Sequence, residues 1–254
     1  MARSLGLTEA RVVRSEWLKF WSLRSRFVTL GISAIGVAAI GAIAAGVVDT
    51  SALDGDPAAR AAVASLGVLP IVLGVLGVLS ATNEYAGGLI RATFAAVPSR
   101  TPVMRAKALV LAAIATATVA ATALAAYGLG ALTYDGGAAY GSPFDGDVIR
   151  FVGAAALEAV GYALLGLGLG LLLRNGAGAI STLMGLVMVV PIVVSLIPWM
   201  SDTVGPYLIS SAQMAVAGSG TDDLLPVPAA LAVFAAWVAV PLVVAVVVTR
   251  RRDA

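Results

Sequence analysis

The sequence predicts an all-α, polytopic membrane protein with six transmembrane helices, an N-terminal amphipathic helix and both termini in the cytoplasm. Hydrophobic residues make up 60% of the 254 residues and charged residues only 12%. A soluble domain carries about a quarter charged residues, so this chain has too few to cover a water-facing surface. Six stretches reach the roughly 20 apolar residues that a helix needs to cross the hydrocarbon core. The alternating segments of a transmembrane barrel are not evident.

The predicted spans are rich in Ala, Val, Leu and Gly and form a transmembrane domain over residues 27–248. They cover about residues 27–48, 61–82, 103–132, 149–173, 177–198 and 227–248. A cleavable signal peptide is not expected, because the first apolar stretch is long enough to span. Between the last two spans, Gly205–Val216 is apolar but too short to cross, which predicts an interfacial or re-entrant helix. Residues 249–254 form a basic cytoplasmic tail.

The basic residues predict the orientation of the chain. All but two of the 16 Lys and Arg residues precede span one, follow spans two or four, or end the chain. The exceptions are Arg60 and Arg150. Because Lys and Arg accumulate in cytoplasmic segments, both termini are expected in the cytoplasm, as an even number of spans requires.

Residues 1–26 are expected to form a cytoplasmic, amphipathic interfacial segment. A helix with Thr8 as its N-cap would place Trp17, Phe20 and Trp21 on one face and a basic row that includes Lys19 on another. Aromatic rings opposite basic side chains suit a helix in the headgroup plane against anionic lipid. An ordinary basic anchor that only sets the topology is the alternative.

Residues 83–102 connect spans two and three on the predicted cytoplasmic side. From Glu84 onwards the pattern predicts an amphipathic helix that Pro98 and Pro102 end. Such a helix could occupy a groove of a partner protein. Its apolar side chains could equally rest on the bilayer, and the residues alone leave both possibilities open.

Three stretches of the chain resemble ABC-2-type transporter permeases. The stretch E-Y-x-x-G-L-I-R-x-T-F-x-A-x-P-x-R, Glu84 to Arg100, resembles their first cytoplasmic loop. The stretch R-S-E-W-L-K-F-W-S-L-R-S, Arg14 to Ser25, resembles their opening segment, especially in the actinobacterial branch. The stretch L-L-R-N-G-A-G-A-I, Leu172 to Ile180, resembles their junction between spans four and five. Together with the six spans, the resemblance covers most of the chain.

This resemblance implies the membrane subunit of an ATP-binding-cassette exporter in the bacterial cytoplasmic membrane. Two permease subunits, copies or paralogues, would form the translocation pathway, and each would dock on a nucleotide-binding ATPase subunit. Carried over residue by residue, the coupling residues are Glu84, Tyr85, Gly88, Arg91, Pro98 and Arg100. The N-terminal helix would act as an elbow at the membrane surface, with Trp17, Lys19, Phe20 and Trp21 at the interface.

The chemistry of such a system is expected in the partner subunit, which would use ATP and Mg. The chain has no G-x-x-x-x-G-K-[ST] phosphate loop. It contains neither Cys nor His, which excludes sulfur-based metal sites and a Ser-His-Asp triad. We therefore expect no bound cofactor, no metal site, no catalytic residue and no nucleic-acid partner; membrane lipid is expected as a neighbour.

Glu158 is the only ionisable residue well inside a predicted span, and an intramembrane acid is by default a candidate functional residue. With Tyr127 and Tyr162 it is a candidate for lining a polar path; a protonated Glu hydrogen-bonded between helices is the favoured alternative. Gly166 and Gly170 form a G-x-x-x-G pair that permits close helix approach. Packing within one subunit is favoured for this pair over a dimer seam.

Two other functions remain alternatives. An ion-driven secondary transporter would need several intramembrane polar groups and often internal repeats; one Glu and no evident repeat count against it. A non-transporting membrane scaffold or sensor of the same fold stays open.

Overall fold

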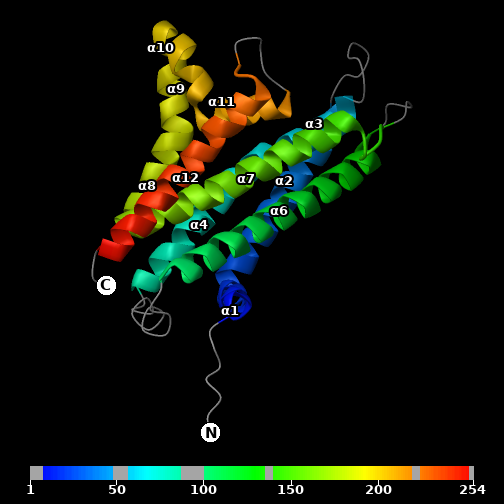
Figure 1. Cartoon of the computed structure of the whole chain (residues 1–254). Coiled ribbons are helices and arrows are strands. Elements are labelled where there is room, and N and C mark those ends of the chain that lie inside the picture. The colour runs from blue at the N-terminus through cyan, green and yellow to red at the C-terminus, as the bar shows by residue number, and fades with distance from the viewer. Residues whose placement is uncertain (1–7, 48–56, 87–99, 135–139, 219–223, 252–254) are drawn as a thin grey trace.

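A computed structural model describes residues 8–47, 57–86, 100–134, 140–218 and 224–251. All regular secondary structure in these residues is helical. Six helical segments are long and apolar enough to cross a membrane: Arg24–Val47, Ala59–Glu84, Thr101–Thr133, Gly146–Leu173, Gly176–Ser195 and Val227–Val248. The predicted all-α class and the number of six such helices are confirmed, and each helix overlaps one predicted span (Figure 1). These helices indicate a multi-pass membrane protein.

The helices have the following bounds in chain order. They are α1 Glu9–Trp21, α2 Arg24–Val47, α3 Pro57–Ala64, the 3₁₀ turn η2 Ser65–Val68, α4 Leu69–Ala86, α6 Arg100–Thr133, α7 Gly146–Leu173, α8 Gly176–Met184, the π-helical turn η3 Gly185–Val189, α9 Val190–Ser195, α10 Pro198–Thr203, the 3₁₀ turn η4 Gly205–Tyr207, α11 Ile209–Ala217 and α12 Val227–Arg251.

The centre of the bundle is a close contact between α4 and α7. A Cβ atom built on Gly166 would lie only 2.1 Å from the carbonyl oxygen of Gly74, and one built on Gly170 would lie 2.8 Å from that of Val78. Only glycine lets the two backbones approach so closely. The predicted packing of Gly166 and Gly170 within one chain is therefore confirmed.

The other long helices surround this pair. Helix α2 packs along α6, and α12 packs along α7, whereas α8 and α9 diverge from the bundle at its edge (Figure 1). Pro191 is the second residue of α9, which follows the π-helical turn η3 directly. Proline has no backbone N–H to donate to the carbonyl four residues earlier. This missing hydrogen bond explains why the regular α-helical hydrogen-bond pattern is interrupted there.

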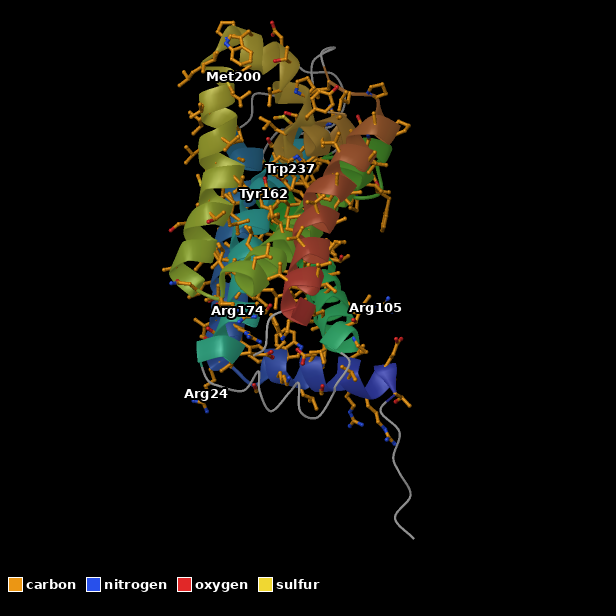
Figure 2. All side chains as sticks on the ribbon, turned by 60° about the vertical axis from the view of Figure 1, so that its left-hand side comes forward. Arg24, Arg105, Tyr162, Arg174, Met200 and Trp237 are labelled. Carbon is orange, nitrogen blue, oxygen red and sulfur yellow. The ribbon has the colours of Figure 1, made fainter. Side chains whose placement is uncertain are left out.

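One end of the bundle carries nearly all the described basic residues, and we call it the basic end. It contains α1, the start of α2, the end of α4, the start of α6 and the last turn of α12 (Figures 1 and 2). Of the basic residues in the described ranges, only Arg60 and Arg150 lie at the opposite end. This distribution agrees with the loop assignment made from the sequence.

At the opposite end, the short helix predicted for the apolar stretch Gly205–Val216 is present as α11, Ile209–Ala217. Helix α11 packs on α12 and α7. Arg150 of α7 holds its C-terminal end, because the Arg150 Nε donates to the Val216 carbonyl oxygen at 2.9 Å. Trp237 of α12 donates its indole N–H to the Tyr207 carbonyl oxygen at 2.8 Å.

Candidate functional site: a buried ion-pair network at the N-terminal helix

Four charged side chains from three helices meet at the basic end: Glu16 and Lys19 of α1, Glu84 of α4 and Lys107 of α6. We call them the ion-pair network. The Lys107 Nζ lies 2.6 Å from Glu16 Oε2 and 2.9 Å from Glu84 Oε1. The Lys19 Nζ lies 2.7 Å from Glu16 Oε1 and 3.5 Å from Glu84 Oε1. Each carboxylate thus contacts both ammonium groups, and the formal charges cancel.

The buried face of α1 brings Glu16 into this network. Val12, Glu16 and Phe20 follow one another at one-turn spacing, and all three are buried. Val12 belongs to one apolar cluster with Val103 of α6. Lys107 lies one turn further along α6 than Val103, which places its ammonium group beside Glu16.

The members of the network differ in burial. The side chain of Glu16 is 3% exposed, that of Lys107 10% and that of Glu84 13%, whereas Lys19 is 43% exposed. Removing one partner of a buried ion pair leaves an uncompensated charge and is strongly destabilising, whereas an exposed pair contributes little. Lys107 is therefore the cation on which the network depends most.

The network shifts the protonation equilibria of its α1 members. Burial raises the pKa of Glu16, but the positive charges of Lys107 and Lys19 and their hydrogen bonds outweigh burial, so this pKa lies below its usual value. Burial lowers the pKa of Lys19, but the hydrogen bond that Lys19 donates to Glu16 and the charges of Glu84 and Glu16 outweigh burial, so this pKa lies above its usual value. Both shifts favour the charged forms.

Arg26 of α2 lies at the edge of the network. Its guanidinium carbon lies 4.7 Å from the centroid of the Phe20 ring, and its Nη1 donates to the Lys19 carbonyl oxygen at 3.4 Å. Arg26, Ser80 and the network line a cavity of about 20 Å³. This volume suits about one water molecule and is too small for an organic substrate. The arrangement is therefore suited to connecting helices rather than to binding cargo.

Across the described ranges, no group of three or more His, Cys, Asp or Glu side chains is placed to hold a metal ion.

Among the predicted coupling residues, Glu84 is part of the ion-pair network. The carboxylate of Glu84 contacts two cations of its own chain, which was not expected from the sequence. Tyr85 lies in the last turn of α4 and Arg100 in the first turn of α6. The other three, Gly88, Arg91 and Pro98, lie outside the described residues, as does most of the helix expected from Glu84. Pro102, expected to end that helix, instead lies in the first turn of α6, where proline is well accommodated.

The predicted N-terminal helix is present as α1, and one of its faces packs on the bundle. Helix α1 follows Thr8 as N-cap residue and lies across the ends of the long helices (Figure 2). Phe20 is buried and Trp21 half-buried, but Trp17 is 42% exposed. Glu16 lies on the buried face with Val12 and Phe20, and Lys19 forms an ion pair with it; neither contact was expected from the sequence.

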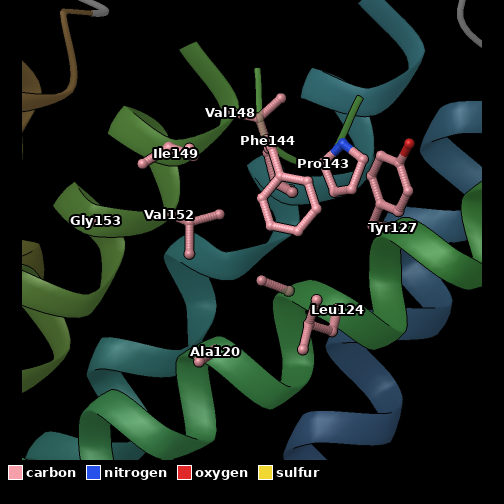
Figure 3. Close-up of a pocket in the computed structure, with 11 residues that line it drawn as sticks. Ala120, Leu124, Tyr127, Pro143, Phe144, Val148, Ile149, Val152 and Gly153 are labelled. Atoms are coloured by element: carbon pink, nitrogen blue, oxygen red, sulfur yellow. The ribbon is translucent and has the colours of Figure 1, made fainter. Parts of the chain in front are cut away.

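The candidate path-lining residues do not form one group. Glu158 and Tyr162 lie one turn apart on α7, both buried, with the Tyr162 hydroxyl within hydrogen-bonding reach of the Glu158 carboxylate. Tyr127 instead lies in the wall of a separate cavity of about 380 Å³, with Phe144 and Val152 (Figure 3). The Tyr127 hydroxyl donates to the carbonyl oxygen of Gly141. This second cavity is almost entirely apolar in its lining.

Sequence reasoning missed Glu16 and Lys107. Lys107 was counted only among the basic residues that follow span two; it lies seven residues into α6, and the residue as a whole is 8% exposed. Lys107 lies near the basic end of α6, beside α1, whereas Glu158 lies in the middle of α7. The available signal was the spacing of Glu16 with Val12 and Phe20, which places a carboxylate on an otherwise apolar face.

Comparison of the chain with models of known protein families gives no match, and no curated protein matches it. Its function is therefore inferred from the residues and their geometry.

Proposed function

We propose that the chain is the permease subunit of an ATP-binding-cassette exporter in the bacterial cytoplasmic membrane. Two permease subunits form the translocation pathway, and each couples through residues 83–102 to a separate ATPase subunit that hydrolyses ATP. The proposal rests on the sequence resemblance together with one structural observation.

That observation is the contact between two resembling stretches that are far apart in sequence. Glu16 and Lys19 belong to the stretch Arg14–Ser25, and Glu84 is the first residue of the stretch Glu84–Arg100. The structure joins them through one direct ion pair, between Lys19 and Glu84, and through Lys107, which contacts both Glu16 and Glu84. The residues that resemble the elbow and the coupling loop of the family therefore form one connected unit.

This unit gives the proposed coupling a physical route. Residues 87–99 connect the end of α4 to the start of α6, and the network ties these two helices to α1. A displacement of the connecting segment by a closing ATPase would move the ends of α4 and α6, and α1 would follow because a buried ion pair is costly to break. Inward-open and outward-open arrangements of the spans would alternate with this movement.

An ion-driven secondary transporter is the second candidate, and Glu158 is the observation that favours it. A buried carboxylate beside the Tyr162 hydroxyl could take up a proton within a span. Transport by a Glu158→Gln variant, measured across pH without ATP, distinguishes the candidates. Transport that requires ATP and keeps its pH profile in the variant favours the exporter.

The test of the proposal is co-purification. The chain is expressed together with the genes that flank its own and isolated in mild detergent. We expect an ATPase subunit in stoichiometric amount and ATP hydrolysis by the complex. An otherwise identical preparation in which the phosphate-loop lysine of that ATPase is replaced controls for contaminating hydrolysis. Isolation of the intact chain without any ATPase partner would overturn the proposal.

A further inference from the structure

An apolar groove of about 380 Å³ lies between α2 and α6, directly beside α1. Trp17 and Trp21 of α1 and Phe27 of α2 form its end near the basic end of the bundle. Their rings are in contact, with centroids 5.7 Å apart for Trp17 and Trp21 and 4.4 Å apart for Trp21 and Phe27. Phe27 is 51% exposed, so the groove is open on its outer side.

Small residues create the hollow along the two helices. Gly31 of α2 and Ala117 of α6 lie in its wall, and a Cβ atom built on Gly31 would meet nothing within 4 Å. The lining runs from Phe27 to Ala34 along α2, which corresponds to about 10 Å of helix. This shape suits a narrow, extended, apolar group such as part of an acyl chain.

Two arginines lie about one helical turn from the aromatic rings of the groove, outside its lining. Arg14 precedes Trp17 by three residues on α1, and Arg24 precedes Phe27 by three residues on α2, so each shares a helical face with a ring of the groove. Both are exposed, and Arg24 points away from the bundle (Figure 2). Neither guanidinium forms an ion pair with a carboxylate of the described residues, in contrast to Lys19 and Lys107.

We propose that this groove is a discrete binding site for one anionic phospholipid. An acyl chain lies between α2 and α6, and the headgroup phosphate lies between Arg14 and Arg24. Lipid, rather than a peptide or a soluble ligand, is the occupant because the groove follows two spans and ends at aromatic rings, which are typical of headgroup depth. The unpaired positive charges select an anionic headgroup over a zwitterionic one. This site is more specific than general attraction of a basic helix to a membrane, and it does not depend on the proposed transport function.

The experiment is native mass spectrometry of the full chain released from detergent micelles. The micelles contain equal amounts of phosphatidylglycerol and phosphatidylcholine with identical acyl chains. The spectrum reports the number and type of retained lipids and, at the same time, the oligomeric state. Two variants alter the site: Gly31→Leu fills the groove, and Arg14→Gln with Arg24→Gln removes the charges.

Each variant has a matched control in the same helix or at the same end. Gly36 of α2 also has open space around its Cβ position and is absent from the groove lining, so Gly36→Leu controls for the added side chain. Arg105 of α6 is exposed at the basic end on the side away from Arg24 (Figure 2), so Arg105→Gln with a second exposed change, Arg11→Gln, controls for lost charge.

We expect one retained phosphatidylglycerol on the native chain and its loss in Gly31→Leu but not in Gly36→Leu. Each of the two groove arginines is expected to contribute about fivefold to the preference for phosphatidylglycerol. Equal retention of both lipids by the native chain would overturn the proposal, as would equal effects of groove and control variants. A change of oligomeric state in Gly31→Leu with unchanged lipid retention would assign the groove to a second copy of the chain and likewise overturn it.

Discussion

The Nζ of Lys107 and the Oε2 of Glu16 lie 2.6 Å apart at the contact between α6 and α1, although 91 residues separate them in the chain. Both side chains are largely buried, and Lys107 also contacts Glu84. A single ammonium group therefore joins the N-terminal helix to two membrane-spanning helices. The first two predictions concern the ion-pair network to which this group belongs.

Replacement of Lys107 by Met should lower the free energy of unfolding by about 3–5 kcal/mol, because two buried carboxylates lose their main cation. The same change at Lys19 should cost less than about 1 kcal/mol, since Lys19 is 43% exposed. Reversible unfolding of the purified chain in detergent, followed by circular dichroism, measures both values. Equal losses in the two variants would contradict the proposed dependence on Lys107.

A variant that does not fold would leave that comparison incomplete, and a compensated variant resolves it. Lys107→Met combined with Glu16→Gln and Glu84→Gln removes the negative charges together with the cation. Most of the lost stability should return, because replacing a whole buried ion group by neutral residues costs far less than removing one partner. A triple variant as unstable as Lys107→Met would show that the charges are not the cause.

The network should also make stability depend on pH in a defined direction. The pKa of Glu16 is lowered in the folded chain, so its contribution is complete above the pKa of the unfolded chain and is lost as the pH falls through the folded value. The pKa of Lys19 is raised, so its contribution is complete below the unfolded pKa and is lost as the pH rises through the folded value. The stability difference between the native chain and Glu16→Gln should therefore be constant near neutral pH and shrink below about pH 4. Melting curves of both proteins from pH 3 to pH 8 check this, and a difference that grows in acid would contradict it.

The helical class and the six long apolar segments follow from the sequence because membrane insertion is governed by length and hydropathy, which are properties of each segment alone. The short connection between α7 and α8 was also predicted, because the spans over residues 149–173 and 177–198 leave only three residues between them. Only Arg174 and Asn175 separate α7 from α8; Arg174 adopts a left-handed conformation with φ of 52°, and the Asn175 side chain accepts a hydrogen bond from the Gly178 N–H.

The ion-pair network was less predictable, because it depends on which helices become neighbours. The charge of Glu84 was interpreted as available to a partner protein, since nothing in residues 83–102 shows that Lys107 and Lys19 lie beside it. The faces of α1 were assigned from its aromatic and basic residues, which gave no reason to expect that Glu16 is buried beside Val12 and Phe20. An ion pair between distant segments offsets the cost of burying each charge, and a single sequence does not reveal such pairs.

The close contact of α4 and α7 yields a third prediction. A methyl group at Gly166 would lie 2.1 Å from the Gly74 carbonyl oxygen, so Gly166→Ala should force the helices apart and cost about 1–3 kcal/mol. Gly128 of α6 has nothing within 4 Å of a Cβ position, and Gly128→Ala should leave stability unchanged or raise it slightly. Unfolding of both variants in detergent provides the comparison. Similar stability of the two would argue against backbone contact at Gly166.

The last prediction tests the coupling role of residues 83–102 apart from the stability of the bundle. Charge reversal at Glu84 would weaken both ATPase docking and the contacts with Lys107 and Lys19, so its effect on docking is ambiguous. Arg91 is the better choice: Arg91→Glu should lower the amount of co-purified ATPase about tenfold through loss of a charge pair with the partner. The amount of chain in the membrane fraction should stay the same. Arg105→Glu, an exposed change at the same end of the bundle, should retain the ATPase. Normal docking and transport by Arg91→Glu would remove Arg91 from the coupling role, and equal losses in both variants would indicate a general effect of charge at the basic end.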